Sequence, residues 1–318
     1  MVKVEGTRAA AQMRLQHVGG FAASRDTLID QAVPVVAAAL ARGDPVALAL
    51  RPATEQALRA ALGEPDGLVA EGERGCAQAG SGQTTAVRRA RELRALIRDT
   101  GSATVLSEHT SDLDGLDGSF WTELDAAMNV ACADLPVQIW CFFPEMPLHL
   151  EVLRGAWRNH PLLLLDGQLR HNPEHRTPRE VLAETPVPAP LLLGPPDVRL
   201  TFTPWRLHEV RTVVEDVLSA AGYGRARTED LVLAVNEIAT NAVEHGAGEP
   251  ELCLWTTIEG VVCEVHDAGT LDDPLPGLRA PHPAEPRGRG LWIARQLCDL
   301  LHVWRDAAGT HVRVRAAA

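Results

Sequence analysis

The sequence predicts two domains of different fold class, an α/β domain over residues 1–183 and an α+β domain, a helix-and-sheet sandwich, over residues 199–318. Three observations support this prediction. The N-terminal part alternates strand-like and helical segments, the C-terminal part starts with two helices before a hairpin, and a proline-rich stretch separates them. Alternation is typical of a mostly parallel sheet covered on both faces, whereas helices grouped beside antiparallel strands form an α+β layer.

Hydrophobic periodicity defines the elements of the N-terminal domain. Apolar residues three and four apart predict helices, and short apolar or β-branched runs predict strands. The predicted helices cover 26–43, which Gly43 closes, 84–100 and 119–135, and the predicted strands cover 45–50, 103–109 and 137–143.

The stretch ETPVPAPLLLGPPDV, residues 184–198, contains five prolines and one glycine. Proline lacks a backbone N–H and fixes φ, so this stretch cannot form a continuous helix or a central strand. We interpret it as the linker between the domains.

The C-terminal domain has a different order of elements. A hairpin is expected to turn near Glu259 and Gly260, because two β-branched runs flank this pair. The expected elements are helices at 204–222 and 228–246, the hairpin at 251–267, a loop rich in proline and glycine at 268–290, a helix at 291–301, and paired strands at 302–306 and 310–316.

Composition and charge exclude several classes of protein. The chain has 318 residues and a formal net charge of -12, which argues against a protein that binds nucleic acid through its phosphate backbone. No apolar run has the length of a bilayer span, and the N-terminus lacks the apolar core of a signal peptide. We therefore expect a cytoplasmic protein with no membrane segment and no direct nucleic-acid contact.

Lysine is almost absent from the chain. Lys3 is the only lysine, so 29 of the 30 basic residues are arginine. A Walker A lysine, a Schiff-base lysine and the strand lysine of protein kinases are thereby excluded. A nucleotide must be bound by another route.

The six cysteines are scattered and form no C-x-x-C pair. This spacing favours buried reduced thiols over a zinc site or a disulfide framework.

The segment LVLAVNEIATNAVEHG, residues 231–246, carries a polar stripe. Glu237, Asn241 and His245 are four residues apart and project from one side of the predicted helix. The asparagine amide offers an oxygen ligand of the kind that Mg²⁺ accepts, and the glutamate one turn earlier can orient or deprotonate an attacking hydroxyl. The alternative for each residue alone is a solvated helix face.

Two glycine-containing segments follow. Asp267 ends a strand and is followed by Gly269, so a carboxylate can accept from an exocyclic amine where a flat ring can approach the backbone. Gly288 and Gly290 directly precede a helix, where exposed N–H groups favour phosphate. Each segment alone is also an ordinary turn or helix start.

Taken in order, these segments resemble the GHKL, or Bergerat-fold, ATP-binding domain from about residue 200 to 318, and more narrowly the anti-sigma factor serine kinases of bacterial partner-switching systems. NEIATNAVEHG is similar to their N box, HDAG to the first glycine box, GRGLWIARQLCD to the second, and GTHVRV to the closing strand with its Gly-Thr near the nucleotide.

The resemblance implies ATP and Mg²⁺ as cofactors and a role for each matching residue. His245 has two open roles, contact with the ligand or capping of the helix. The implied roles are catalytic base for Glu237, Mg²⁺ ligand for Asn241, contact with the adenine amine for Asp267, packing beneath the base for Gly269, proximity to the phosphates for Gly288 and Gly290, neutralisation of phosphate charge for Arg287 and Arg289, and proximity to the nucleotide for Thr310.

The sequence departs from the family in two places. The first glycine box often reads Asp-x-Gly-x-Gly, whereas Leu271 stands at the second glycine position. The proline-rich loop 270–287, at the place of the ATP lid, does not have the usual character of a lid. Both departures concern phosphotransfer more than nucleotide binding.

His208 in LHEVR faintly resembles the His-Glu that accepts phosphate in histidine autokinases. In those enzymes the phosphate-accepting histidine lies on a two-helix dimerisation hairpin well upstream of the N box. Only 29 residues separate His208 from Glu237, which leaves no room for such a hairpin, so we expect His208 on the surface of the first helix.

Residues 15 to 185 resemble the MEDS sensory domain, named for methanogen and methylotroph regulators, through 17–50, 124–144 and 153–175. Such domains are similar to degenerate P-loop folds that have lost nucleotide chemistry. His17 is expected just after a first strand, Glu108 and His109 after the run TVLS, and His160 before Pro161. At such strand ends they would line a ligand pocket or be satisfied polar residues. Pro173 interrupts the two histidines of HNPEH, so no metal is assigned there.

The resemblances together imply a transcription regulator with an N-terminal sensory domain for a small-molecule signal. Its C-terminal domain would sequester a sigma factor and phosphorylate a serine or threonine of an anti-anti-sigma partner with a STAS fold. Related kinases are usually dimers, so a homodimer is compatible with the resemblance. The alternative is a non-catalytic protein-binding regulator with a degenerate or purely structural ATP site.

Overall fold

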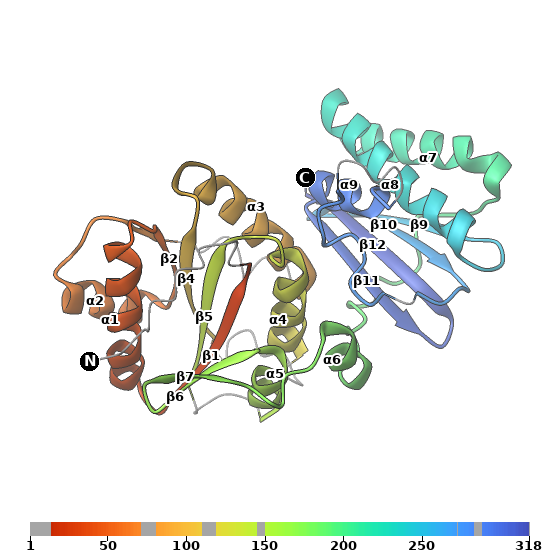
Figure 1. Cartoon of the computed structure of the whole chain (residues 1–318). Helices are drawn as coiled ribbons and strands as arrows, with labels where there is room; N and C mark the ends of the chain where they lie inside the picture. Colours follow the sequence, from red (N-terminus) through yellow and green to blue (C-terminus); the bar gives the residue numbers. More distant parts are fainter. Residues whose placement is uncertain are drawn as a thin grey trace. The chain divides into compact units, whose positions relative to one another are not determined.

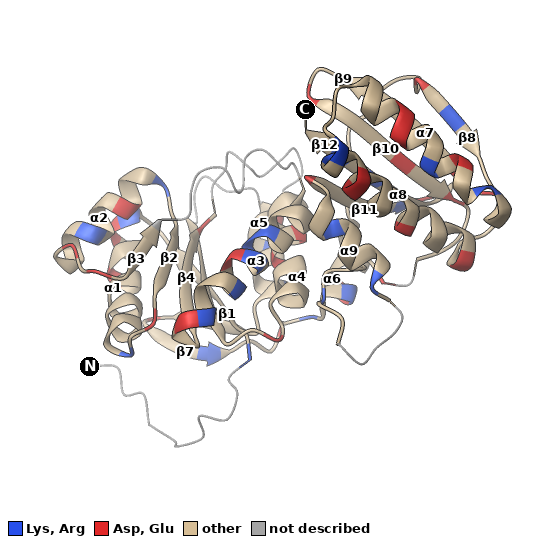
Figure 2. Ribbon diagram, turned by 90° about the horizontal axis from the view of Figure 1, so that it is seen from above, with Lys and Arg blue, Asp and Glu red and all other residues tan. Residues whose placement is uncertain are grey.

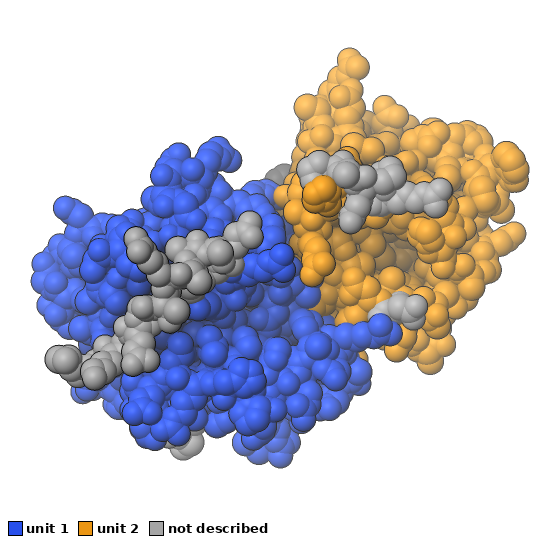
Figure 3. Space-filling view, viewed as in Figure 1, with its two compact units in different colours: residues 1–185 blue, residues 186–318 orange. Residues whose placement is uncertain are grey.

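The computed structural model describes residues 14–70, 81–109, 119–144, 150–271, 273–282 and 288–317. The chain divides into two compact units, residues 1–185 and residues 186–318 (Figure 3). These ranges are called unit 1 and unit 2, and each is built around a sheet of its own (Figure 1).

Unit 1 contains a sheet whose strands, within the described residues, follow the order β3-β2-β4-β5-β1-β6-β7. Its neighbouring strands are parallel except for the antiparallel pair β6 and β7, so the expected mostly parallel sheet is present. The strands are β1 (Gln16–Ala22), β2 (Val46–Ala49), β3 (Leu68–Ala70), β4 (Ala103–Glu108), β5 (Val137–Pro144), β6 (Leu162–Leu165) and β7 (Gln168–His171).

The helices of unit 1 begin and end where local chemistry favours it. The Ser24 hydroxyl accepts from the Thr27 amide at the start of the first helix, and Gly101 ends the third with a left-handed φ of 83°. Apolar side chains from this first helix, such as Leu28 and Val36, pack on Val18 of β1 in the core. The helices are α1 (Arg25–Ala41), α2 (Pro52–Leu62), α3 (Gly82–Thr100), α4 (Ser119–Ala131), α5 (Leu150–Asn159) and α6 (Pro178–Glu184).

Unit 2 contains an antiparallel sheet in the order β11-β12-β10-β9-β8. Three helices lie over one face of this sheet (Figure 1). The elements are β8 (Val198–Thr201), the short 3-10 helix η2 (Pro204–Arg206), α7 (Leu207–Ala220), α8 (Arg225–His245), β9 (Glu251–Thr257), β10 (Gly260–Asp267), α9 (Gly290–Leu297), β11 (Leu300–Asp306) and β12 (Gly309–Ala317).

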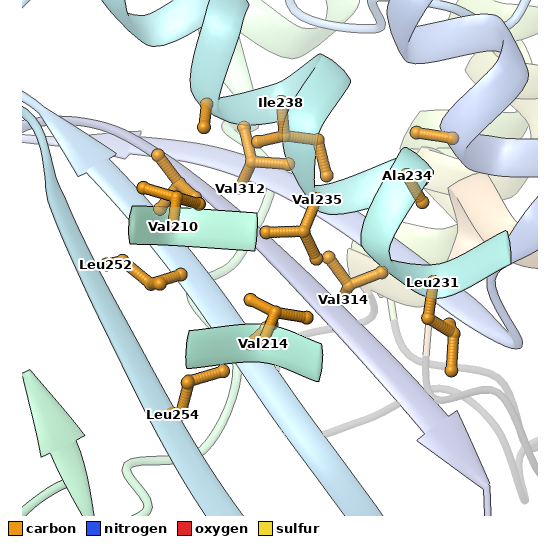
Figure 4. Packing of buried hydrophobic residues seen from close by; sticks show 14 of the residues in the cluster. Val210, Val214, Leu231, Ala234, Val235, Ile238, Leu252, Leu254, Val312 and Val314 are labelled. Carbon is orange, nitrogen blue, oxygen red and sulfur yellow. The ribbon is translucent and has the colours of Figure 1, made fainter. Parts of the chain in front are cut away.

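The core of unit 2 lies between the helices and the sheet. Val210 and Val214 of α7 and Val235 of α8 face the strands, and Leu252 and other inward side chains of the sheet meet them (Figure 4). Alternate strand residues point inward, as period-2 patterning requires. The outer sides of α7 and α8 carry charges of both signs (Figure 2). This two-layer arrangement is the predicted α+β sandwich.

Two expectations about elements need correction. The helix expected at 291–301 ends at Leu297, because Cys298 is extended and Leu300 already pairs with Arg315 in the sheet. His17 lies within β1 and not after it. Helical periodicity continued into the apolar start of β11, which sequence reasoning could not separate from the helix.

The stretch interpreted as a linker contains no helix or strand from residue 185 to residue 197, and Val198 already begins β8. Its backbone carbonyls bind the sheet face opposite the helices. Pro188 O accepts from His302 Nε2 at 2.9 Å, Leu191 O from Arg313 Nη1 at 2.8 Å, and Gly194 O from Trp255 Nε1 at 3.1 Å. This stretch therefore connects the two units and also packs on the sheet of unit 2, and we call residues 186–197 the strap.

None of the helices in the described ranges combines the length and the apolar character that a membrane span needs.

Candidate functional site

Unit 2 holds a cavity of about 850 Å³ between α8, the end of β10, the start of α9 and β12. This volume lies within the range of small-molecule sites. The cavity gathers the predicted site residues that the structure describes, namely Glu237, Asn241, His245, Asp267, Gly288, Arg289, Gly290 and Thr310 around its wall, and Gly269 beside Asp267. Arg287 lies outside the described residues.

Glu237 and Asn241 project from α8 toward the first residue of α9. A Cβ added at Gly290 would lie 2.7 Å from Glu237 Oε2 and 3.4 Å from Asn241 Nδ2. The start of α9 therefore approaches these two side chains closely, and a larger residue at 290 would displace them. The approach places helix N–H groups, which favour anions, beside a carboxylate and an amide.

Asp267 ends β10 and is 8% exposed. Its Oδ1 accepts from Gly269 N at 2.7 Å and from Ala247 N at 3.3 Å. Among the described residues both of these hydrogen bonds use Oδ1, so Oδ2 can accept from a ligand. A fixed carboxylate in a cavity wall suits an exocyclic amine.

Two glycines leave room for this carboxylate. A Cβ at Gly269 would lie 2.6 Å from Asp267 Oδ1, and a Cβ at Gly246 would lie 2.5 Å from the same atom and would overlap Ala242 O. The sequence analysis identified Gly269 but not Gly246. The only signal for Gly246 was its place at the end of α8.

Thr310 completes this part of the wall from β12. It pairs with Asp267 in the sheet register, and its hydroxyl donates to Gly269 O at 3.0 Å. The closing strand thus holds the loop that follows β10. Thr310 therefore positions the loop, whatever contact it makes with a ligand.

The described part of the loop before α9, residues 273–282, packs closely on that helix. Gly277 has a φ of 70°, and a Cβ there would lie 2.7 Å from Leu291 C. The buried Arg295 donates from Nε to Pro276 O and from Nη1 to Leu301 O, both at 2.9 Å. Sequence reasoning missed Arg295, because nothing in RGRGLWIARQL distinguishes it from a surface arginine.

Leu271, at the position where the family often has a second glycine, lines the cavity and packs against the apolar core of unit 2. An apolar wall is therefore present at a position where a glycine would leave backbone exposed.

Arg289 and His245, the last residue of α8, also line the cavity. Arg289 precedes the first residue of α9 and donates from Nη2 to His282 O at 3.4 Å. The side chain of His245 is 75% exposed, with Nε2 3.9 Å from Glu244 Oε2. His208 is exposed at the start of α7 and bonds Trp205 O, as expected for a surface residue.

The histidines predicted to line a pocket in unit 1 do lie together. The rings of His17 and His160 are 4.2 Å apart between centroids, and His109 Nε2 is 3.2 Å from Asp125 Oδ1. Glu108 is separate, and its carboxylate accepts from Arg51 N. Sequence reasoning missed the contribution of Asp125, which lies on a helix with no motif around it.

The five cysteines within the described ranges are free thiols, and four of them are buried. Cys76 lies outside those ranges. The expectation that the cysteines are buried is met for these four.

Helices over one face of an antiparallel sheet, with a cavity between two helix ends and two strands, give unit 2 a pocket of the kind that binds small molecules. Residues 200–316 match the family of the histidine kinase-like ATPase domain. This match supports the Bergerat-fold interpretation of unit 2. A search of curated proteins finds no match to the chain.

Proposed function

We propose that the protein is an anti-sigma factor whose unit 2 binds ATP with Mg²⁺ and transfers phosphate to a protein serine or threonine. The observation that carries the proposal is the single cavity in which Glu237, Asn241, Asp267 and Gly290 meet from three separate elements. The family match over residues 200–316 supports ATP as the ligand.

The residues of the cavity fit this ligand. Asp267 Oδ2 would accept from the adenine amine, and glycine at 269 leaves room for the Asp267 carboxylate that would make this contact. Asn241 offers a hard oxygen to Mg²⁺, and the N–H groups at the start of α9 would bind phosphate. ATP supplies the transferable phosphoryl group, and Mg²⁺ neutralises phosphate charge.

Glu237 is the proposed general base. Its carboxylate would hold the attacking hydroxyl and accept its proton. Arg289 at the rim would offset negative charge in a chain that has no lysine available here.

The resemblance to anti-sigma kinases supports the choice of partners. In this proposal unit 2 binds either a sigma factor or a STAS-fold anti-anti-sigma protein, and phosphorylation of the latter controls the exchange. Unit 1 would act as the sensory domain, which requires that its signal bind two conformations with different affinity.

Leu271 favours a second candidate, a regulator that binds ATP only as a structural ligand. It packs against the core where the family often has a glycine, so one wall of the site is less adaptable. Phosphotransfer separates the two candidates.

The first test is calorimetric titration of ATP into the full chain, with and without Mg²⁺, beside Asn241→Ala. We expect Mg²⁺-dependent binding that the variant loses. Asn236→Ala, on the same helix but outside the cavity, is the matched control and should bind as the wild type does. If the folded wild type does not bind ATP, the proposal is wrong.

The second test uses Glu237→Gln with γ-labelled ATP and the STAS-fold proteins of the same organism. The variant should bind ATP and fail to label the partner. Full labelling by the variant would exclude Glu237 as the base. Binding of ATP without labelling by the wild type would favour the structural-ligand candidate.

A further inference from the structure

Unit 1 buries a cluster of polar side chains that has no role in the proposed function. His17 comes from β1, Asp125 from α4, Cys141 from β5 and His160 from the turn before β6. All four are at most 2% exposed. One ligand atom from each lies within 4.8 Å of the others.

The separations between these atoms resemble those of a tetrahedral metal centre. His17 Nε2 is 3.3 Å from Cys141 Sγ and 4.0 Å from Asp125 Oδ1. Asp125 Oδ1 is 4.0 Å from Cys141 Sγ, and Asp125 Oδ2 is 4.0 Å from His160 Nε2. Bonds to zinc in tetrahedral geometry give ligand separations of about 3.3–3.7 Å. The three separations of 4.0 Å exceed this range by about 0.3–0.7 Å, and the ligand atoms as a set lie within 4.8 Å of one another, so the side chains would draw together by up to about 1 Å to complete the shell.

The hydrogen bonds around the two imidazoles direct their lone pairs inward. His160 Nδ1 lies 2.7 Å from the Ala156 carbonyl, which can only accept, so Nδ1 carries the proton. Asn129 donates its own amide to Asn159 O, so its Oδ1 faces His17 Nδ1 as an acceptor at 2.9 Å. Both Nε2 atoms therefore present lone pairs to the cluster.

Two of these atoms lack a hydrogen bond among the residues that the structure describes, namely His160 Nε2 and Asp125 Oδ2. An imidazole lone pair and a carboxylate oxygen both accept, so neither satisfies the other. Buried acceptors that face each other without a donor are costly. A cation between them removes this cost.

The surroundings supply the outer contacts that metal ligands need. His17 and His160 each donate their second ring N–H to an oxygen, and His109 Nε2 lies 3.2 Å from Asp125 Oδ1 as a donor to that carboxylate. A divalent ion with one carboxylate, one thiolate and two neutral imidazoles is a neutral unit, which suits full burial.

We propose that His17, Asp125, Cys141 and His160 form a zinc site inside unit 1. The donor set of two imidazole nitrogens, a thiolate and a carboxylate is one that Zn²⁺ accepts, and it leaves no position for substrate. The bonds form by coordination, with release of the thiol proton to solvent. The site stabilises unit 1 and is independent of ATP binding.

The test begins with the wild-type full chain and needs no variant. Protein dialysed against a chelator and then loaded with Zn²⁺ should retain one equivalent per chain, measured by elemental analysis after gel filtration. Loading should raise the Tm of one unfolding transition by on the order of 10 °C. No retained zinc and no shift would overturn the proposal and leave the cluster as a hydrogen-bonded network.

Cobalt(II) identifies the ligands. The Co²⁺-loaded wild type should show intense tetrahedral bands and a thiolate-to-cobalt charge-transfer band. Cys141→Ser should lose the charge-transfer band, whereas Cys298→Ser, with its cysteine in unit 2, should keep it.

His160→Ala should lose the bound zinc, and His171→Ala, with an exposed histidine of β7, should keep it. If His160→Ala does not fold, the wild-type loading and the Cys141→Ser spectrum still decide the matter. A charge-transfer band that survives Cys141→Ser would overturn the assignment of this ligand.

Discussion

Gly290, the first residue of α9, lies against the carboxylate of Glu237 in α8, so closely that a Cβ on the glycine would approach Glu237 Oε2 to 2.7 Å. The backbone N–H groups at the start of one helix are thus held beside the proposed base on another. Because the two residues are 53 positions apart in the sequence (290 − 237), this contact depends on how α8 and α9 pack.

The contact predicts the effect of Gly290→Ala. The added methyl group would displace the Glu237 carboxylate while leaving Asp267 in place, so phosphotransfer should fall at least about tenfold and ATP affinity much less. Labelling kinetics and calorimetry measure the two effects. Gly224→Ala is the control, because a Cβ there meets nothing within 4 Å. Equal losses in both variants would contradict the prediction.

Asp267→Asn tests recognition of the base. An amide retains Oδ1 for Gly269 and Ala247 and replaces Oδ2 by a donor, which cannot accept from the adenine amine. ATP affinity should fall by about 10- to 100-fold, the cost of leaving polar groups unpaired, with little change in the free energy of unfolding. Asp216→Asn, exposed on α7, should change neither quantity. Unchanged ATP affinity in Asp267→Asn would argue against this contact.

Replacement of Arg313 and of Arg315, both on β12, should lower the free energy of unfolding by different amounts. Arg313 and its partner Glu264 are 10% and 13% exposed, and Arg313 also binds the strap at Leu191 O. Arg313→Ala should lower the free energy of unfolding by about 3 kcal/mol, because it removes the guanidinium partner of a mostly buried carboxylate and leaves His311 as its remaining partner. Chemical denaturation gives the value.

Arg315 is the matched control, two residues along the same strand. It pairs with Glu259, whose side chain is 68% exposed, so solvent screens the pair. Arg315→Ala should cost less than about 1 kcal/mol. Similar losses for both arginines would show that burial of the Glu264 pair is not the decisive factor.

The stability of unit 2 should also depend on pH through His311. Burial alone would lower the pKa of His311, but hydrogen bonds with Glu264 and Asp306 outweigh it and raise the pKa above 6.5. A raised pKa stabilises the folded state fully below the unfolded value, and this contribution is lost as pH rises through the folded value. The difference in unfolding free energy between the wild type and His311→Gln should therefore shrink as pH rises from about 6 to about 8.5.

Glu264 has its own pH dependence with the opposite sign. Burial alone would raise its pKa, but hydrogen bonds from His311 and Arg313 lower it, so its contribution is present above the unfolded pKa of 4.5 and is lost in acid. Glu264→Gln should weaken the part of the pH dependence of the unfolding free energy that comes from His311, between neutral and alkaline pH. If the unfolding free energies of the wild type and His311→Gln change in parallel with pH, the raised pKa of His311 and its pairing with Glu264 are both contradicted.

Local sequence patterns predicted the helices and strands whose formation depends mainly on residues close in the sequence. The period of 3.6 predicted α1, α3, α4 and α8 to within a few residues, and period-2 runs predicted β5 and the β9–β10 hairpin. The polar stripe of α8 and Gly269 beside Asp267 were visible because their residues lie within short segments of the sequence. The order of these segments carried the resemblance to Bergerat-fold domains.

The short strands at one end of the unit 1 sheet were harder to predict from the sequence. β6 and the edge strand β7 have four residues each, and their formation depends on the neighbouring strand more than on propensity. The end of α9 was also missed, because the apolar residues that follow it could continue a helix or start β11 until the partner strand was known.

The sequence by itself determined the polar stripe of α8, the turns and the helix starts, because these depend on the spacing of residues along the chain. Tertiary structure alone decided which distant residues each of these side chains contacts. It placed Arg295 on two carbonyls of distant segments, laid the proline-rich stretch on the sheet of unit 2, and joined Asp125 and Cys141 to two histidines. Such contacts arise when packing brings distant residues together, and no local period records them.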